Sequence, residues 1–399
     1  MRLLYLQQLL VLPGCPGNAR SWEFARQWQA AGHEITLLAS TAHLPPDHPL
    51  IQGQPFPLYT TYEGVRLILL KVSYDHMMPF AARIKAFLQF YRQVWALRHH
   101  LGGYDAVLAY SAPLSVGDLG RRLAWHLQVP FLFEIADVWP DVPAGMGLIP
   151  QGPILNWLYR RTRRMYEAAR RIYVFSEGMR DQVMEHGVAG ERIRVIPNGT
   201  QIRPLPQRPV RQEPGLRVLY AGTVGRANDL TLLLAAIRLL VQAGRTDIHL
   251  TLLGGGNDLS RVRAYAQAQG PLPVTFLAQV PQEAVREQLH AADVGVVCFA
   301  AYPVLAANSA TKFFEYLAAG LPVVINYEGW QADYLRTWNC GLAAPAGDAV
   351  ALASHLQYLA DHPQLRDEMG QRGRALAVAC FDRVTLASQM MEDIQASLT

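Results

Sequence analysis

The stretch LLYLQQLLVLPGCPGNARSWEFARQWQAAGHEITLLA, residues 3–39, decides the fold. Its apolar run over residues 3–12 predicts a buried strand, and the Pro- and Gly-rich residues 13–18 predict a loop. Helical periodicity over residues 21–31 and a second apolar run at residues 35–39 predict a helix and another strand. Elements in this order favour a parallel sheet covered by helices.

An alternative for the first run is a short secretory signal peptide, because Arg2 precedes it. Gln7 and Gln8 interrupt the apolar residues, and Arg2 is the single basic residue before them. Cleavage of a signal peptide here would also remove the first strand from a regular alternation of strands and helices. We therefore interpret the run as the first strand.

The alternation of strands and helices continues along the chain and restarts once. In the first half, further strands are expected at residues 65–72, 106–110, 131–134, 172–175 and 194–196. In the second half, strands are expected at residues 216–221, 249–253, 274–276, 294–299 and 322–325, and helices at residues 230–243, 259–269, 283–292, 311–319, 349–360 and 364–398. Between the halves, residues 197–214 hold five prolines and little apolar sequence, which is typical of a linker.

This organisation predicts an α/β protein with two doubly wound parallel-sheet domains. The expected bounds are residues 1–200 for the first domain, 201–214 for the linker and 215–378 for the second domain. A C-terminal helix at residues 379–399 is expected to pack back on the first domain. Because ligands of such sheets bind at the carboxyl ends of the strands, we expect a site built from strand-to-helix loops in an interdomain cleft.

Composition excludes several classes of protein. With 51% hydrophobic and 17% charged residues the chain is not disordered, and no run approaches the ~18 apolar residues of a membrane-spanning helix. The four cysteines are too scattered for a metal site or a disulfide framework, which favours a reducing compartment. The net charge of +4 is too small to indicate nucleic-acid binding, and the basic excess lies in residues 1–199, with 20 Lys and Arg against 15 Asp and Glu.

The segment NSATKFFEYLAAG, from Asn308 to Gly320, has the features of an anion-binding helix start. Asn308 and Ser309 are expected to cap the helix, and Gly320 is expected to end it. Lys312 lies in the first turn, where unpaired N–H groups and the helix dipole favour a diphosphate. Glu315 follows on the same face, in reach of a ribose diol. The alternative is an ordinary surface Lys–Glu pair.

Several motifs in succession resemble one family, the retaining nucleotide-sugar glycosyltransferases of family 4. The motifs are TKFFEYLAAGLPVV (311–324), VIPNG (195–199), LYAGTVGR (219–226), LLGGG (252–256), AADVGVV (291–297), AGHEITLL (31–38), FEIADVWPD (133–141) and VFSEGMRD (174–181). The last three resemble the branch that builds bacterial O-antigen, capsule and exopolysaccharide. The resemblance covers residues 3–382 and implies the GT-B fold, with two Rossmann-like domains, the active site between them and no bound metal.

The resemblance also implies which residues hold the donor. Glu315 matches the glutamate that binds the donor ribose. The donor site further takes in Asn308, Ser309, Ala310 and Thr311, which face the sugar and diphosphate, Gly14 and Gly17 of the first loop, Gly222, Thr223 and Gly254 of the later glycine motifs, and Val280 near the base.

Three positions depart from the family pattern. The family's second glutamate is replaced by Ala307, which leaves the identity of the donor sugar open. Its usual Arg and Lys after the first strand of the second domain are replaced by Thr223 and Asn228. Since charge develops on the leaving diphosphate, we expect Arg226 and Lys312 to supply the positive charge as catalytic groups.

The motif FEIADVWPD places candidate catalytic carboxylates at the end of a strand. Glu134 and Asp137 are candidates for the acceptor side, where a general base takes the hydroxyl proton. The resemblance implies same-face attack in which the leaving phosphate helps to remove this proton, so Asp137 either acts as a base or orients the acceptor. The alternative is that Asp137 caps the turn before Pro140. Trp139 packs either under an acceptor sugar or in the core.

Residues 154–172 form a predicted basic amphipathic helix. One half of it carries Arg160, Arg161, Arg163, Arg164, Arg170 and Arg171, and the other half carries Ile154, Leu155, Leu158, Met165 and Ala169. Its apolar half is expected to pack on the sheet, and its basic half is either solvated or docks on anionic lipid. Aromatic and basic residues at 77–100 add to this surface.

These features predict a metal-independent glycosyltransferase without a cofactor. It would move a hexosyl or N-acetylhexosaminyl group from a nucleotide-diphosphate donor, expected to be a UDP-sugar, to a hydroxyl of a polyprenyl-diphosphate-linked or other glycan acceptor in cell-surface polysaccharide synthesis. The expected location is the cytoplasm, with peripheral association at the inner face of the cell membrane, and no nucleic-acid partner is expected. The alternatives are a nucleotide-sugar 2-epimerase of the same fold and a non-catalytic two-lobed sugar-binding protein; a nicotinamide-dependent oxidoreductase is disfavoured because no GxGxxG follows the first strand.

Overall fold

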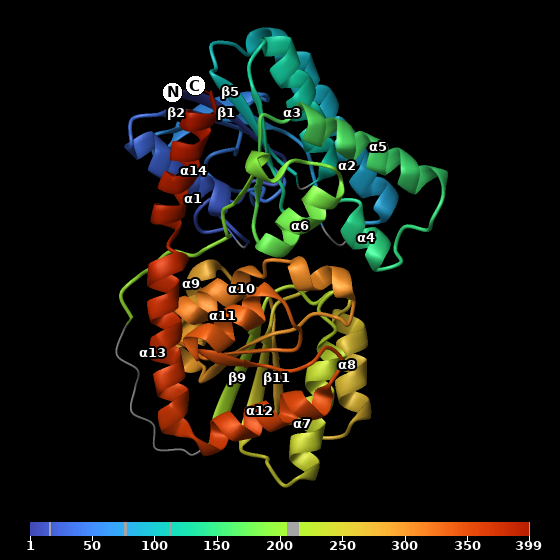
Figure 1. Cartoon of the computed structure of the whole chain (residues 1–399), viewed down its shortest axis with the longest axis vertical. Helices are drawn as coiled ribbons and strands as arrows, with labels where there is room; N and C mark the ends of the chain where they lie inside the picture. Colours follow the sequence, from blue (N-terminus) through green and yellow to red (C-terminus); the bar gives the residue numbers. More distant parts are fainter. Residues whose placement is uncertain (16, 76–77, 112, 206–214, 399) are drawn as a thin grey trace. The chain divides into compact units, whose positions relative to one another are not determined.

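The computed structural model describes two compact units (Figure 1). The described residues are 1–15, 17–75, 78–111, 113–205 and 215–398. Unit 1 comprises Met1–Pro197 and Arg383–Thr399, and unit 2 comprises Asn198–Asp382. Most of the expected linker, residues 206–214, lies outside the described residues.

Unit 1 is built on an eight-stranded sheet with the order β3-β4-β2-β1-β5-β6-β7-β8. Its strands are β1 (Arg2–Gln7), β2 (Glu34–Ser40), β3 (Leu58–Tyr62), β4 (Val65–Leu70), β5 (Ala106–Tyr110), β6 (Phe131–Glu134), β7 (Arg171–Val174) and β8 (Ile193–Val195). The first apolar run is the central strand β1, which pairs in parallel with β2 and β5. The edge strand β3 was not expected and pairs antiparallel with β4, so the sheet is not wholly parallel.

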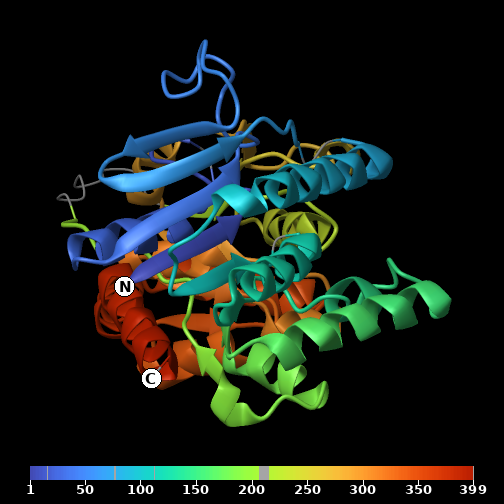
Figure 2. The ribbon, with the colours of Figure 1, turned by 90° about the horizontal axis from the view of Figure 1, so that it is seen from above.

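Helices cover both faces of this sheet (Figure 2). They are α1 (Arg20–Ala30), α2 (Phe80–Leu97), α3 (Leu114–Leu127), α4 (Asp141–Gly145), α5 (Pro153–Ala168), α6 (Glu177–Glu185) and α14 (Arg383–Leu398), with the short 3-10 helices η1 (Arg98–His100) and η2 (Gly190–Arg192). α2, α3 and α5 lie side by side on one face, and α1 packs with α14 on the other. The Trp28 indole N–H donates to the Ala387 carbonyl over 2.7 Å and ties α1 to α14.

Unit 2 has a six-stranded parallel sheet with the order β11-β10-β9-β12-β13-β14. Its strands are β9 (Leu216–Ala221), β10 (Ile248–Leu253), β11 (Val274–Leu277), β12 (Val294–Val297), β13 (Val323–Ile325) and β14 (Gly341–Ala343). Its helices are α7 (Leu230–Gln242), α8 (Leu259–Ala268), α9 (Gln282–Ala291), η3 (Pro303–Ala307), α10 (Thr311–Ala318), α11 (Trp330–Trp338), α12 (Ala349–Asp361) and α13 (Pro363–Cys380). α12 packs with α7, and α13 packs with α10 and α11. Sequence analysis did not predict α11 and β14.

The helix expected over residues 364–398 is two helices. The chain leaves helical geometry at Phe381, where the Phe381 carbonyl accepts a hydrogen bond from the Thr200 amide over 2.9 Å. Thr200 and Asp382 also form an isolated parallel bridge. The expected start of the last helix at residue 379 therefore falls inside α13, and unit 1 resumes only at Arg383.

No helix in the described part of the chain has both the length and the apolar character needed to cross a bilayer.

Candidate active site

Both sheets reverse their strand order at one point, which is where doubly wound sheets bind ligands. In unit 2 the reversal lies between β9 and β12, and the loops that follow these strands carry most of the predicted donor residues. In unit 1 the reversal lies between β1 and β5, so the loop after β1, with Gly14 and Gly17, is at the same topological position.

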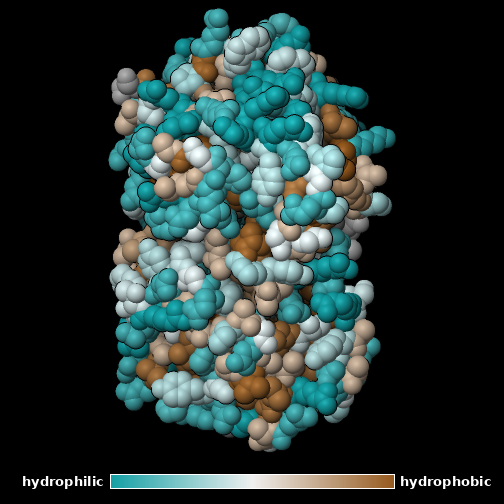
Figure 3. Space-filling view, turned by 45° about the vertical axis from the view of Figure 1, so that its right-hand side comes forward, coloured by the Kyte–Doolittle hydropathy of each residue, from teal (hydrophilic) through white to brown (hydrophobic). Residues whose placement is uncertain are grey.

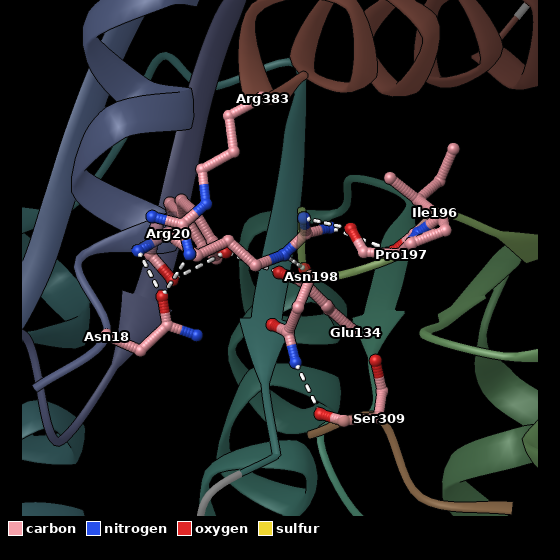
Figure 4. A network of polar contacts seen from close by, with 10 residues as sticks. Asn18, Arg20, Glu134, Ile196, Pro197, Asn198, Ser309 and Arg383 are labelled. Atoms are coloured by element: carbon pink, nitrogen blue, oxygen red, sulfur yellow. Dashed lines mark hydrogen bonds and ion pairs between the residues drawn. The ribbon is translucent and has the colours of Figure 1, made fainter. Parts of the chain in front are cut away.

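The start of α10 differs from the expected one. The helix begins at Thr311, and Ala310 is the N-cap residue without a side-chain hydrogen bond, so the expected capping by Asn308 and Ser309 is wrong. The loop is instead held through its carbonyl groups. The side-chain amide of Asn198 donates a hydrogen bond to the Ser309 backbone carbonyl over 3.1 Å (Figure 4).

The neighbouring Asn308 carbonyl is held in the same way, because it accepts a hydrogen bond from the Trp330 indole over 3.0 Å. This placement leaves the Asn308 side chain outside the cap. The end of α10 is as expected: Gly320 has a φ of +69°, and the amides of Gly320 and Leu321 donate to the carbonyls of Leu317 and Tyr316.

Lys312 turns into the unit rather than toward solvent. Its Nζ atom donates to the Tyr220 hydroxyl over 3.2 Å and lies 4.5 Å from the centroid of the Tyr220 ring. A Cβ atom at Gly222 would lie 2.7 Å from the Lys312 Cε atom, so a side chain at this position would displace the end of the lysine. The alternative of an ordinary surface pair is therefore wrong for Lys312.

Burial sets the charge of Lys312. Loss of solvent lowers its pKa to about 8, although the neighbouring Cys298 and Glu315 act in the opposite direction. Glu315 lies one turn further along α10 and is partly buried. An ammonium group and a carboxylate on one helix face, next to a glycine loop, are chemically suited to a diphosphate joined to a ribose.

The glycines after β9 and β10 allow two loops to touch through their backbones. Gly222 and Gly254 have φ values of +149° and +141°, and a Cβ atom at Gly254 would lie 2.0 Å from the Gly222 carbonyl oxygen. The Gly222 amide donates to the Leu253 carbonyl over 2.9 Å, and the Val224 amide donates to the Gly255 carbonyl over 2.8 Å. Gly222 and Gly254 thus shape the loop that carries Thr223.

The remaining donor-side residues lie further from Lys312 along the chain. The Thr223 side chain is exposed, and its carbonyl accepts a hydrogen bond from the Tyr220 hydroxyl over 2.7 Å. Arg226 is exposed in the same loop, and its charge contributes to lowering the pKa of Asp258. Val280 is partly buried in the segment after β11.

Glu134 lies in the core of unit 1 (Figure 4). Its carboxylate accepts a hydrogen bond from the Arg20 Nε atom over 3.0 Å and another from the Tyr5 hydroxyl. Arg20, which is 1% exposed, also donates to the carbonyls of Ile196 and Pro197 over 3.2 and 2.7 Å. A fully buried carboxylate with both oxygens bonded cannot reach an acceptor hydroxyl, so this placement argues against a catalytic role for Glu134 and gives it a structural one.

Asp137 is placed differently from Glu134. It is partly buried, burial raises the pKa of its carboxyl group, and no hydrogen-bond partner for it is found in the described part of the chain. The alternative that Asp137 caps the following turn does not hold. Pro140 is the N-cap residue of α4, and no side chain caps this helix with a hydrogen bond. Trp139 is neither core nor fully exposed, and its carbonyl accepts a hydrogen bond from the Thr162 hydroxyl over 3.2 Å.

The loop after β1 needs glycine at its two predicted donor positions. Gly14 has a φ of +81° and open space where a side chain would be. Gly17 has a φ of +127°, and a Cβ atom there would lie 2.9 Å from a Val11 methyl group. The left-handed backbone at both positions favours glycine.

The basic helix is shorter than expected. α5 ends at Ala168, so Arg170 and Arg171 do not lie on its surface. Arg170 donates to the Ser397 carbonyl over 2.7 Å, and Arg171 pairs with Asp393 over 2.9 Å. These two arginines therefore bind α14 to the rest of unit 1 and do not contribute to the basic face of α5.

Tyr220, Asn198 and Trp330 also position the site, although no sequence pattern predicted them there. Tyr220 and Asn198 lie within recognised motifs, but no local pattern shows which distant group a buried hydroxyl or amide will meet. Within the described ranges, no group of three or more His, Cys, Asp or Glu side chains is placed to hold a metal ion.

Two family models match the chain in succession. "Glycosyl transferase 4-like domain" matches residues 17–199, and "Glycosyl transferases group 1" matches residues 202–376. A curated relative, the phosphatidyl-myo-inositol mannosyltransferase of Mycobacterium leprae (strain TN), is 30% identical over 201 residues, which make up 49% of this chain and 51% of the relative. The match thus spans about half the length of this relative.

Solved structures resemble the chain over nearly its whole length. Sucrose-phosphate synthase from Thermosynechococcus elongatus has a TM-score of 0.77 at 19% identity, covering 99% of this chain and 98% of that one. Anabaena Alr3699/HepE, solved in complex with UDP-glucose, has a TM-score of 0.71 at 15% identity, covering 99% and 100%. At these identities the likeness shows the fold alone. The likeness shows the GT-B fold, and the two family models, which together match most of the chain, show that it belongs to the glycosyltransferases with a glycosyl transferase 4-like domain followed by a group 1 domain.

Proposed function

We propose that the protein is a retaining glycosyltransferase that takes a sugar from a nucleotide-diphosphate donor, expected to be a UDP-sugar. One observation carries the proposal: Lys312 turns toward Gly222 at the start of α10, one turn before Glu315. The start of α10 and Lys312 would hold the diphosphate, and Glu315 would accept hydrogen bonds from the ribose hydroxyls. The solved complexes of Anabaena Alr3699/HepE with UDP and UDP-glucose support the choice of nucleotide.

In the proposed reaction the bond between the anomeric carbon and the diphosphate oxygen breaks. An acceptor hydroxyl forms the new bond on the same face of the sugar, and its proton passes to the leaving phosphate oxygen. Lys312 and Arg226 would stabilise the negative charge that develops on the diphosphate. Asp137, with a raised pKa and no partner in the described residues, would orient the acceptor hydroxyl, with Trp139 beside the acceptor sugar.

A thermal-shift panel of UDP, GDP and their sugars tests the donor. A ligand at 100 times its Kd adds about 2.7 kcal/mol to the free energy of unfolding, which for a domain of this size raises Tm by roughly 5–10 °C. We expect such a shift with UDP compounds, and a smaller one in Lys312→Ala and Arg226→Ala. No shift with any nucleotide would contradict the proposal.

Turnover of the donor then separates transfer from the alternatives. Product that forms when the acceptor is omitted would indicate a 2-epimerase. Binding without turnover would indicate a sugar-binding protein. Full activity in EDTA is expected, because the proposed roles of Lys312 and Arg226 leave no step to a metal.

We further propose a membrane-associated acceptor of the polyprenyl-diphosphate class. The helices α2, α3 and α5 together carry nine Lys and Arg against two Asp and Glu, although the net charge of the whole chain is only +4. At the centre of this layer, Arg121, Arg122 and Arg161 gather around Asp118 at 3.1–3.3 Å. This leaves an excess of positive charge that suits anionic phosphate groups.

The same helices also expose apolar side chains. Six of the fifteen large hydrophobic residues exposed in the described chain lie on them: Phe80, Ile84, Leu88, Trp125, Ile154 and Trp157. On α2 they form one stripe, because Phe80, Ile84 and Leu88 are spaced four residues apart. Ile154 was expected on the packed side of α5, yet it is 70% exposed. Figure 3 shows this side of the molecule as mostly hydrophilic, with separate hydrophobic patches.

Vesicle co-sedimentation without any sugar nucleotide tests this surface. We expect binding to phosphatidylcholine vesicles that contain phosphatidylglycerol, and weak binding to phosphatidylcholine alone. Arg160→Gln with Arg164→Gln should weaken binding about tenfold or more, because each cation near an anionic surface contributes about 1 kcal/mol.

The matched control is Arg238→Gln with Arg263→Gln, two exposed arginines of unit 2. A second variant, Ile84→Ser with Leu88→Ser, tests insertion of the apolar stripe, with Val350→Ser on α12 as its control. Equal binding of both vesicle types, or equal loss in the control variants, would contradict a docking surface on α2, α3 and α5.

A further inference from the structure

Tyr220, the penultimate residue of β9, joins Lys312 to the loop that follows this strand. Its side chain is fully buried. Its hydroxyl donates to the Thr223 carbonyl over 2.7 Å and receives a hydrogen bond from the Lys312 Nζ atom over 3.2 Å. One oxygen atom therefore links the β9–α7 loop to the first turn of α10.

The direction of these bonds favours a charged lysine. A tyrosine hydroxyl has a single proton, and here that proton is used toward the Thr223 carbonyl. The oxygen lone pairs remain for the Lys312 ammonium, which has only donors. The face of the Tyr220 ring adds a second attraction, since the Nζ atom lies 4.5 Å from the ring centroid.

We propose that Tyr220 is a positioning residue that holds Lys312 in place and in its ammonium form. Without the hydroxyl, the partly buried lysine would lose its hydrogen-bond acceptor, and the Thr223 carbonyl would lose its donor. Gly222, which lies against the end of the lysine, has no side chain that could hold Lys312 in place. The effect of Tyr220 on diphosphate binding rests on the proposed function. Its effect on the position and charge of Lys312 does not.

Other charged groups around Lys312 act alongside Tyr220. Two titratable side chains lie near the lysine: Cys298, which follows β12, and Glu315 on α10. Burial raises the pKa of the Cys298 thiol to about 12, so the thiol is neutral near pH 8. Glu315 is then the anionic neighbour of the lysine, and its contribution is unchanged by a substitution at Tyr220.

The lysine content makes a direct measurement feasible. The chain has three lysines, Lys71, Lys85 and Lys312, so protein labelled with [ε-13C]lysine gives three resolvable NMR signals in the absence of ligand. Loss of the Lys312 signal in Lys312→Arg assigns it. We expect a titration near pH 8 in the wild type and one roughly 0.7 pH units lower in Tyr220→Phe, because the loss of one hydrogen bond changes the protonation equilibrium about fivefold.

Tyr316→Phe is the matched control. Tyr316 is buried like Tyr220, and its hydroxyl is bonded to a backbone group, the Ala221 amide, over 2.8 Å. Removing this hydroxyl disturbs the same end of β9 without touching Lys312. The Lys312 signal should therefore titrate as in the wild type. An equal change in both variants, or no change in Tyr220→Phe, would overturn the proposal.

UDP binding as a function of pH connects this inference to the donor site. The wild-type affinity should fall as the pH rises through about 8, and in Tyr220→Phe the fall should begin roughly 0.7 pH units lower. Lys312→Arg should show no such fall, because arginine stays charged. A wild type that binds no UDP would contradict the proposed function and would leave the lysine titration as the separate test of Tyr220.

Discussion

A Glu315→Ala variant is expected to bind UDP at least about 100-fold more weakly than the wild type. A carboxylate that accepts two ribose hydroxyl bonds contributes about 1.5–3 kcal/mol for each bond, and 2.7 kcal/mol already corresponds to a factor of 100. Glu315 is only partly buried on α10, so its removal should leave the Tm of the ligand-free protein nearly unchanged. Isothermal titration with UDP and a melting curve without ligand measure the two effects.

Two further variants make this test specific to the position. Glu315→Gln keeps the shape of the side chain and one acceptor oxygen, so its loss should be intermediate. Glu368→Ala removes a half-exposed carboxylate on α13 and should bind UDP like the wild type. An unchanged Kd in Glu315→Ala would mean that the ribose is bound elsewhere.

The second large effect is expected on stability. Glu134→Ala should lower the free energy of unfolding by about 3–5 kcal/mol, because it leaves the Arg20 guanidinium buried without its carboxylate. The Tyr5 hydroxyl also loses its buried acceptor. For a unit of this size the loss corresponds to a fall in Tm of roughly 10 °C. Chemical denaturation followed by circular dichroism checks the value.

A double-mutant cycle separates a structural role of Glu134 from a catalytic one. Replacing both partners, Arg20→Met with Glu134→Leu, should cost less stability than the two single changes added together, because no buried charge is then left unpaired. If Glu134→Gln instead melts like the wild type while sugar transfer falls by two orders of magnitude, the carboxylate acts in catalysis and the structural role is wrong.

Much of the fold could be predicted because its strands are continuous apolar runs. β5, β6 and β9 have the expected bounds, since nearly all of their residues are apolar and buried. The short strand β14 and helix α11 lacked such a signal. The start of the last helix was expected at residue 379, but the break lies at Phe381, whose carbonyl is bonded to the Thr200 amide, remote in sequence.

The candidate site was predictable in part. The first-turn position of Lys312 follows from helical spacing and was confirmed. The capping by Asn308 and Ser309 was wrong, because hydrogen bonds from Asn198 and Trp330 hold the loop in another conformation. The basic face of α5 lost two arginines because the helix ends before them and α14 binds both.

The sequence by itself determined most of the alternating strands and helices, the division into two sheets and the helix start that carries Lys312 and Glu315, because hydrophobic periodicity and spacing act locally. Only the tertiary structure decided which charged groups are buried and what they meet. Glu134 and Asp137 stand three residues apart in one motif, yet Glu134 is locked against Arg20 and Tyr5 while Asp137 has no partner in the described residues. The physical reason is that the cost of burying a charge depends on partners more than a hundred residues away, which no local pattern records.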